Sequence, residues 1–209
     1  MEFRSVVEKR ASVRQFTGDP VSADDLREMV RLAGLSPSVN NSQPWQFIAI
    51  TNKDVLRRMA DAVHAKIGQM LPDKNDEAAA RAKNQVDFFS TFFADAPAVV
   101  AVAMCPYEAI VDRVIAGTQL THEEMNAVRG HPDIQSIGAA VQTLILAAVD
   151  MGYGTCWLSG PLIARQEIEQ CLGIQGNWQL AAMVALGRPA GSVSQRPKKA
   201  VDEILRIVD

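Results

Sequence analysis

Residues 36–50 read Ser-Pro-Ser-Val-Asn-Asn-Ser-Gln-Pro-Trp-Gln-Phe-Ile-Ala-Ile, and two patterns that shape the fold meet in this stretch. The first nine residues are dense in turn formers and side-chain amides, which predicts a polar loop. The residues from Phe47 to Ile50 form an apolar run that is typical of a strand. The sequence therefore predicts a polar loop that leads directly into a sheet.

A helix is predicted on the N-terminal side of this loop. Ser22 is suited to the N-cap, and Asp24 and Asp25 complement the positive end of the helix dipole. The pattern ends near Gly34. Four apolar residues recur on one stripe of this helix: Leu26, Met29, Val30 and Ala33.

Further elements are predicted on the C-terminal side of the loop. Helical patterns cover residues 54–67, 76–93, 133–151 and 161–172, and strand patterns cover residues 98–104, 155–158 and 178–186. Long helices that alternate with a few short strands predict an α+β or α/β sandwich.

Three segments carry weaker or unusual patterns. The helix at 133–151 is apolar nearly all round, so the core or another subunit must cover every side of it. Residues 105–132 have little pattern and are interpreted as a lid or an excursion. Residues 192–209 are interpreted as a C-terminal arm, in which residues 201–208 are apolar enough to dock on another surface.

Composition limits the class of protein. The chain has 209 residues, of which 48% are hydrophobic, and the Pro and Gly residues gather at no boundary, so a single domain over residues 1–209 is expected. A net charge of −3 provides no basic excess for nucleic acid. No apolar run reaches the roughly 20 residues that span a bilayer, and no secretory signal is evident, so no membrane association is expected. Three cysteines without a C-x-x-C pair fit a reducing, cytoplasmic compartment.

Several catalytic and binding motifs are missing from the sequence. Neither the dinucleotide motif G-x-G-x-x-G, nor the phosphate loop G-x-x-x-x-G-K-[ST], nor the nucleophile motif G-x-S-x-G occurs. The three histidines lack metal-binding spacing, so no metal site is expected, and His122 with Glu123 and Glu124 is interpreted as a solvated helix start. Cys156 and Cys171 are interpreted as small buried hydrophobic residues. We therefore expect no catalytic residue from the protein itself.

The segment Arg10-Ala11-Ser12-Val13-Arg14 is the first candidate binding element. If it is extended, Arg10, Ser12 and Arg14 share one face. If it is helical, the two arginines form an i,i+4 pair of like charges that repel unless an anion lies between them. Both conformations favour an anion, although two exposed arginines near an N-terminus are also common on any solvated surface.

The loop from Ser36 to Trp45 is the second candidate element. Its amides at Asn40, Asn41 and Gln43 offer paired donors and acceptors that suit the polar edge of a planar heterocycle, and Trp45 adds a flat apolar surface. The alternative is a loop whose amides only cap its own backbone.

Taken together, these motifs resemble the nitroreductase family of FMN-dependent oxidoreductases. The resemblance rests on Arg10-x-Ser12-x-Arg14, on Ser36-Pro37-Ser38-x-x-Asn41-Ser42-Gln43-Pro44-Trp45, and on Gly152-x-Gly154-Thr155-Cys156-Trp157 after a long apolar helix. Leu186-Gly187-Arg188-Pro189 and Arg196-Pro197-Lys198 close the series. The resemblance implies an α+β sandwich with a mostly antiparallel central sheet flanked by helices, and an intertwined homodimer with one FMN at each of two interface sites.

The resemblance also assigns the cofactor-binding residues. Arg10, Ser12 and Arg196 are expected to hold the FMN phosphate, and Arg14 to lie near the ribityl or pyrimidine side of the flavin. Pro37, Ser38, Asn41 and Gln43 are expected to reach the flavin from the other subunit. Trp157, Leu158, Ser159 and Gly160 are expected to run along the ring, with a backbone N–H of Ser159 or Gly160 donating to flavin N5.

The activity implied is hydride transfer from NADH or NADPH to flavin N5, followed by reduction of an electrophilic acceptor such as a nitroaromatic or a quinone. Three alternatives remain: a reductive dehalogenase or flavin-consuming enzyme of the same fold, a non-catalytic FMN-binding module, and an α/β ligand-binding domain with surface arginines. The first would require charged groups in the lid, where the only cluster is Tyr107, Glu108, Asp112 and Arg113, interpreted as a solvated helix. Leu158-Ser159-Gly160-Pro161 also lacks the acidic residue that some members of the family carry there.

Overall fold

The computed structural model describes residues 2–71 and 76–208, so Met1 and Asp209, the ends of the predicted domain and arm, lie outside the described residues. The helices are α1 (Phe3–Lys9), α2 (Ala23–Ala33), α3 (Lys53–Met70), α4 (Glu77–Thr91), α5 (Ile110–Ile115), α6 (His122–Val128), α7 (Pro132–Asp150), α8 (Arg165–Leu172) and α9 (Val201–Ile204), with the 3-10 helices η1 (Val39–Asn41), η2 (Phe92–Asp95) and η3 (Gly160–Ala164). The strands are β1 (Trp45–Ile50), β2 (Ala98–Met104), β3 (Gly154–Leu158) and β4 (Gln179–Gly187).

The four strands form one antiparallel sheet in the order β1-β2-β4-β3. In the register, Trp45 pairs with Met104, Ala98 with Leu186, and Gly154 with Gly187. Because every pairing is antiparallel, the fold is α+β, and the α/β alternative is wrong.

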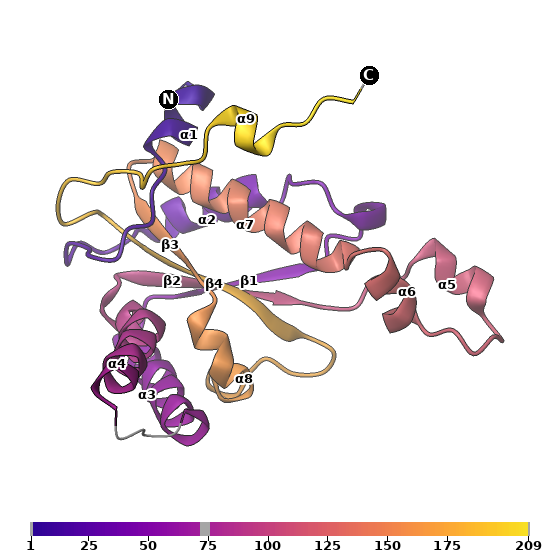
Figure 1. Cartoon of the computed structure of the whole chain (residues 1–209), viewed down its shortest axis with the longest axis horizontal. Coiled ribbons are helices and arrows are strands. Elements are labelled where there is room, and N and C mark those ends of the chain that lie inside the picture. Colours follow the sequence, from indigo (N-terminus) through magenta and orange to yellow (C-terminus); the bar gives the residue numbers. More distant parts are fainter. Residues whose placement is uncertain (1, 72–75, 209) are drawn as a thin grey trace.

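Helices cover both faces of this sheet (Figure 1). Along β2 the side chains alternate, so that Val99 and Ala101 pack in a core with α3 and α8, while Val100 and Val102 pack in a second core with α2 and α7. The residues of β2 from Ala98 to Ala103 are fully buried. This burial on both faces explains the wholly apolar run of the strand, because no side of it meets solvent.

Helix α2 confirms the pattern predicted for it. The hydroxyl of Ser22 accepts a hydrogen bond from the Asp25 backbone N–H at 3.0 Å, as an N-cap does. Leu26, Met29 and Ala33 are buried on the predicted stripe. Helix α2 therefore lies against α7 with its apolar face inward.

Helix α7 is long and apolar enough to cross a membrane when judged by length and composition alone. Its most apolar window is 56% buried inside the fold, as in the core helix of a globular protein. Among its apolar residues, Ile134 remains half exposed near the start of the helix. The fold thus covers most of the apolar surface that the sequence placed on this segment.

Two predicted helices differ in detail from the structure. The pattern at residues 161–172 begins as the 3-10 helix η3 and becomes α-helical at Arg165. The pattern at residues 76–93 ends as an α-helix at Thr91, and η2 follows, where the tighter turn places Phe93 fully inside the core.

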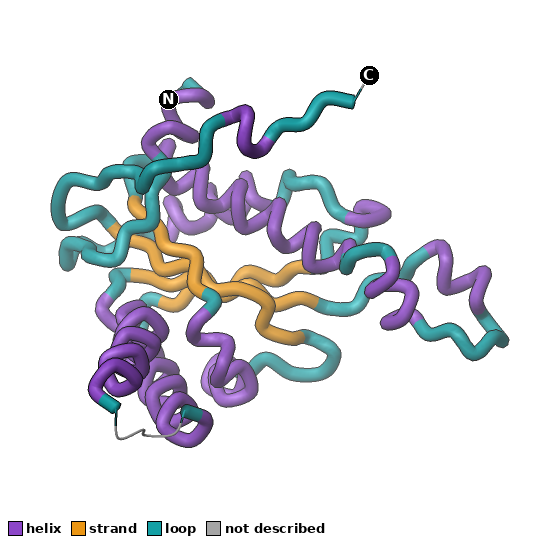
Figure 2. Tube along the Cα trace, viewed as in Figure 1, coloured by secondary structure: helices purple, strands orange, loops and turns teal. Residues whose placement is uncertain are grey.

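Residues 105–132 form an excursion that projects beyond the sheet and carries α5 and α6 (Figures 1 and 2). At the other end of the molecule, the C-terminal arm passes beside α1, and most of it is loop (Figure 2). The apolar side chains of Val201, Ile204, Ile207 and Val208 are exposed, so the expected docking of the arm tip stays a prediction.

Candidate cofactor site

The segment after α1 is extended, which decides between its two predicted conformations. The backbone leaves the helix at Arg10, and Ser12 then forms a parallel bridge with Thr155 at the start of β3. The N–H of Val13 donates to the carbonyl of Thr155 at 2.8 Å. Arg10, Ser12 and Arg14 therefore alternate with the buried Ala11 and Val13 and face away from the core.

Gly154 permits this close approach to β3. A Cβ atom at position 154 would lie 2.6 Å from Cγ2 of Val13 and 3.0 Å from Cγ of Pro189. Any larger residue would push these two segments away from the strand. The glycine of the Gly152-x-Gly154 motif thus has a packing role next to the arginine segment.

Residues 188–190, which lead into the C-terminal arm, run beside the same segment. The N–H of Thr17 donates to the carbonyl of Arg188 at 2.8 Å, and the N–H of Ala190 donates to the carbonyl of Gln15 at 3.0 Å. Phe16 and Pro189 form an antiparallel bridge. These contacts bring the two ends of the chain together on one side of the molecule (Figure 1).

A groove of about 720 Å³ lies between the two segments. Four cationic residues line it: Arg10, Arg14, Arg196 and Lys198. No acidic side chain lines the groove, and none of the four cations forms an ion pair within residues 2–71 and 76–208. Four positive charges without a counter-charge favour a small, highly charged anion.

The end of α4 forms the aromatic wall of the groove. Phe88 lines it and is 59% exposed, and the guanidinium of Arg14 lies 5.5 Å from the ring centroid of the neighbouring Phe89. Ser90 then packs against Gly160, where a Cβ atom would lie 3.3 Å from the Cα of Ser90. Helix α4 therefore joins the cationic groove to the turn after β3.

The predicted flavin-contacting residues lie at this turn. Trp157 is 44% exposed, Leu158 is buried in the core, and Ser159 and Gly160 are exposed at the start of η3. An exposed tryptophan and two exposed residues lie where a planar ring could contact them. Leu158, the last residue of β3, instead packs in the core with α3 and α8 and does not face the turn.

Cys156 lies on the core side of β3, as predicted. Burial raises the pKa of its thiol, and the nearby positive charge of Arg14 and a hydrogen bond with Ser12 only partly oppose this effect. A thiol with a raised pKa is a poor nucleophile near neutral pH. The structure therefore agrees with an inert cysteine.

The loop of residues 36–45 lies at the other end of α7, near α6 (Figure 1). The N–H of Val39 donates to Oγ of Ser136 at 3.0 Å, and the N–H of Gln43 donates to Oγ of Ser38 at 3.0 Å. Ser136, which anchors Val39, lies 14 residues before Asp150 at the end of α7, so roughly 21 Å of helix separates this part of the loop from the end of α7 near the arginine segment. Four predicted site residues, Pro37, Ser38, Asn41 and Gln43, therefore lie apart from the groove within one chain.

The amides of this loop do not cap its backbone. Hydroxyls of Ser136 and Ser38 accept from backbone N–H groups of the loop instead, and no hydrogen bond within the described residues uses the side-chain amides of Asn40, Asn41 or Gln43. All three side chains are exposed, and all three residues have positive φ, between 47° and 52°. The strained backbone thus presents unpaired amides at the surface.

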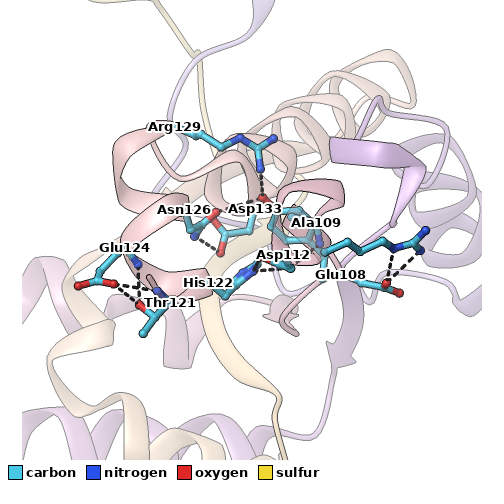
Figure 3. A network of polar contacts seen from close by, with 11 residues as sticks. Glu108, Ala109, Asp112, Thr121, His122, Glu124, Asn126, Arg129 and Asp133 are labelled. Atoms are coloured by element: carbon cyan, nitrogen blue, oxygen red, sulfur yellow. Dashed lines mark hydrogen bonds and ion pairs between the residues drawn. The ribbon is translucent and has the colours of Figure 1, made fainter. Parts of the chain in front are cut away.

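The excursion is held by a polar network (Figure 3). Nη1 of Arg129 donates to the hydroxyl of Tyr107 at 3.2 Å, the hydroxyl donates to Oδ1 of Asn126 at 3.3 Å, and Nδ2 of Asn126 donates to Oδ2 of Asp133 at 2.9 Å. Asn126 and Asp133 are buried. The network fixes the excursion to the first turn of α7.

The interpretation of Tyr107 as part of a solvated helix is wrong. Tyr107 lies before α5 and is only 6% exposed, and burial raises its pKa. Glu108 and Arg113 do form an exposed pair, at 3.0 Å. His122 begins α6 as expected, but its Nδ1 also lies 2.9 Å from Oδ2 of Asp112, which joins α5 to α6. Among the described residues, no group of three or more His, Cys, Asp or Glu side chains is arranged to hold a metal ion.

Sequence reasoning did not assign three groove residues. Lys198 belongs to the basic segment Arg196-Pro197-Lys198, in which the resemblance assigns a role only to Arg196. Phe88 lies within the predicted helix at residues 76–93. It forms an exposed aromatic pair with Phe89, and such a pair in a polar helix indicates a binding surface. Gln195 carried no signal, because its contact partners lie at the other end of the chain.

The described architecture is that of known flavoproteins. A BluB-like flavoprotein from Clostridium difficile 630 superposes with a TM-score of 0.90 at 32% identity, with 100% of both chains covered. A nitroreductase with bound FMN from Desulfitobacterium hafniense DCB-2 superposes with a TM-score of 0.73 at 20% identity, over 100% of this chain and 99% of the other. The fold is therefore the α+β sandwich of the nitroreductases.

Sequence comparison identifies the family. The nitroreductase family model matches residues 7–188, and the chain belongs to this family. A putative NADH dehydrogenase/NAD(P)H nitroreductase from Archaeoglobus fulgidus is 26% identical over 90% of this chain and 86% of the relative. A 5,6-dimethylbenzimidazole synthase from Rhodospirillum rubrum is 28% identical over 86% of this chain and 78% of the relative.

Proposed function

We propose that this protein is an FMN-dependent oxidoreductase that passes hydride from NADH or NADPH to an electrophilic acceptor, such as a nitroaromatic or a quinone. The observation that carries the proposal is the groove with four cations and no acidic residue in its lining. A flavin phosphate carries nearly two negative charges at neutral pH, and two or three charge-assisted contacts suit it. The groove volume of about 720 Å³ lies within the usual range of cofactor pockets.

Bound FMN would supply the hydride chemistry, so the residues of the chain have to bind and orient it. Arg10, Arg196 and Lys198 would hold the phosphate, with Ser12 beside them. Arg14 would place its charge near the ring edge, because its guanidinium is directed along the groove toward α4 by the Phe89 ring. Positive charge at that edge stabilises the anionic reduced form of a flavin.

Trp157, Ser159 and Gly160 would orient the ring. These three residues do not line the groove, but Gly160 lies against Ser90, two residues after Phe88, which does. The backbone N–H of Ser159 or Gly160 would donate to flavin N5. No side chain is assigned as a proton donor.

Pro37, Ser38, Asn41 and Gln43 would complete the site from a second protomer. Their separation from the groove along α7 prevents one chain from placing both sets on one ligand, whereas their exposed amides suit the polar edge of a flavin. We therefore propose a homodimer with two equivalent sites. Its compartment would be the cytoplasm, in keeping with three free cysteines.

The test of this function has two stages. Purified protein is mixed with FMN and examined for flavin absorbance and for retention of flavin on a desalting column. The holoprotein is then mixed anaerobically with NADH and with NADPH, and bleaching of the flavin band is expected with at least one of them. Protein that retains no FMN contradicts the cofactor assignment, and flavin that stays oxidised indicates a non-catalytic module.

A second candidate function is consumption of the flavin itself. It is favoured by the BluB-like flavoprotein, which is 32% identical over the whole chain, and by the relative named as a 5,6-dimethylbenzimidazole synthase. Reduced holoprotein is returned to air, and the flavin is extracted and quantified. Full recovery of FMN supports the oxidoreductase, whereas irreversible loss of FMN with release of a new heterocycle supports the second candidate.

A further inference from the structure

A single side chain fastens the C-terminal arm to the N-terminal helix. Nε2 of Gln195 donates one hydrogen bond to the carbonyl of Val7 at 3.0 Å and another to the carbonyl of Arg10 at 2.8 Å. A carboxamide nitrogen carries two hydrogens, so this group uses its full donor capacity on α1 and on the residue that ends it. Both acceptors belong to the C-terminal end of a helix, where carbonyls lack partners within the helix.

The arm has little else to hold it. Residues 191–200 are all exposed and form no helix or strand. The two bonds of Gln195 join the arm to Val7 and Arg10, and just before the arm the N–H of Ala190 donates to the carbonyl of Gln15. The position of Arg196 and Lys198 therefore depends on Gln195.

The same side chain also contacts the arginine segment that lines the groove. Gln195 binds the carbonyl of Arg10 itself, and it immediately precedes Arg196. Arg10 and Arg196, which both line the groove, are thus linked through one carboxamide. Without this link the charges of Arg196 and Lys198 would repel that of Arg10, and the loop would move away from it.

We propose that Gln195 is a positioning residue that couples docking of the C-terminal arm to binding of a phosphate dianion in the groove. The inference rests on the proposed function for the identity of the ligand as FMN. By linkage, if arm docking strengthens binding of the dianion, then the dianion must strengthen arm docking by the same factor. In this proposal Gln195 does not contact the ligand. It acts by holding Arg196, Lys198 and the backbone of Arg10 in place.

The first test compares ligands with and without the phosphate. The dissociation constants of FMN and riboflavin are measured for the wild type, for Gln195→Leu, and for the control Gln69→Leu, whose exposed glutamine on α3 makes no hydrogen bond in the described structure. We expect Gln195→Leu to weaken FMN binding by roughly 10-fold, on the scale of one or two neutral hydrogen bonds, and to leave riboflavin binding unchanged. An unchanged FMN constant, or equal losses for both ligands, would overturn the proposal.

The second test follows the arm directly. Trypsin cleaves after Lys198 and Lys199, which lie in the exposed arm. In the wild type we expect FMN to slow cleavage there several-fold and riboflavin to have no effect, and in Gln195→Leu we expect FMN to give no protection. Equal protection of both proteins would contradict the coupling.

The two proposals fail in different ways. If the wild type binds no FMN, the proposed function is wrong, and inorganic phosphate then serves as the probe in the same proteolysis assay. Protection of the wild type by phosphate, but not of Gln195→Leu, would still support the positioning role. If FMN binds the wild type and Gln195→Leu equally well, the proposed function stands and the role of Gln195 is refuted.

Discussion

Arg10 and Arg196 lie almost the whole chain apart, yet both line the cationic groove. We expect Arg10→Ala to weaken FMN binding by about 1.5–3 kcal/mol, or roughly 10- to 150-fold, because it removes a charge-assisted contact to the phosphate. Isothermal titration measures the change, with Arg58→Ala on the exposed face of α3 as the control. An unchanged dissociation constant for Arg10→Ala would place the phosphate elsewhere.

Tyr153 makes a second contact between distant segments. Its ring is buried against the Arg188 guanidinium, 4.4 Å from the ring centroid, and its hydroxyl donates to Oδ2 of Asp25 at 2.5 Å. This contact joins the start of α2 to the start of β3. We expect Tyr153→Phe to lower the midpoint of urea unfolding, since the ring stays and only the hydrogen bond is lost. An unchanged midpoint would show that water replaces the hydroxyl at no cost.

The same contact predicts a dependence on pH. The hydrogen bond from Tyr153 holds the pKa of Asp25 below its usual value of 3.8. An aspartate whose pKa is lower in the folded state stabilises the fold above its unfolded pKa, and this contribution is lost as the pH falls through the folded value. The free energy of unfolding of the wild type should therefore exceed that of Tyr153→Phe by its largest amount at pH 6, and this difference should decrease below about pH 3.8. A difference that stays constant down to pH 3 would contradict this assignment.

Among the elements, the contact between β3 and the arginine segment depends on Gly154. Gly154→Ala would drive a Cβ atom into Val13 and Pro189, and overpacking of this kind costs about 1–3 kcal/mol. We expect both a lower stability and weaker FMN binding, because Val13 lies between Ser12 and Arg14. Thermal unfolding and FMN titration measure the two effects.

A matched substitution separates this packing effect from the general effect of alanine. Gly68 lies within α3, where a Cβ atom would meet nothing within 4 Å. Gly68→Ala is therefore expected to stabilise the protein by about 0.5–1 kcal/mol through helix propensity. If Gly154→Ala were equally harmless, the close approach of the two segments would not matter for the site.

Elements with a strong local pattern were predictable from sequence. The Ser22 cap with its apolar stripe gave α2, and the apolar run of β2 gave a buried strand, because both depend on neighbours in the chain. The 3-10 helices η2 and η3 and the burial of Tyr107 were not predictable. They depend on partners such as Asn126 and Arg129, which are brought to Tyr107 only by the folded excursion.

At the scale of the whole molecule, the two halves of the predicted site lie at opposite ends of α7. We expect the protein to sediment as a dimer at micromolar concentration, with Arg10 of one protomer and Asn41 of the other at each site. A monomer in sedimentation velocity that still binds FMN tightly would contradict a shared site.

Mixed dimers test the sharing of residues directly. Arg10→Ala and Asn41→Ala are each expected to weaken FMN binding in their own homodimers. In a heterodimer of the two, one site carries both substitutions and the other carries neither, so about half of the sites should bind FMN as the wild type does. Absence of a wild-type site in the purified heterodimer would show that Arg10 and Asn41 do not act across an interface.

The sequence by itself determined the family resemblance, the main helices and strands, and the residues suited to an anion and to a planar ring. These follow from residue type and from spacing along the chain. Only the tertiary structure decided that the arginine segment is extended, that both chain ends form one groove, and that the amide loop lies away from it. The reason is physical: the groove and its fastening by Gln195 arise from contacts between residues up to 188 positions apart, which no local pattern encodes.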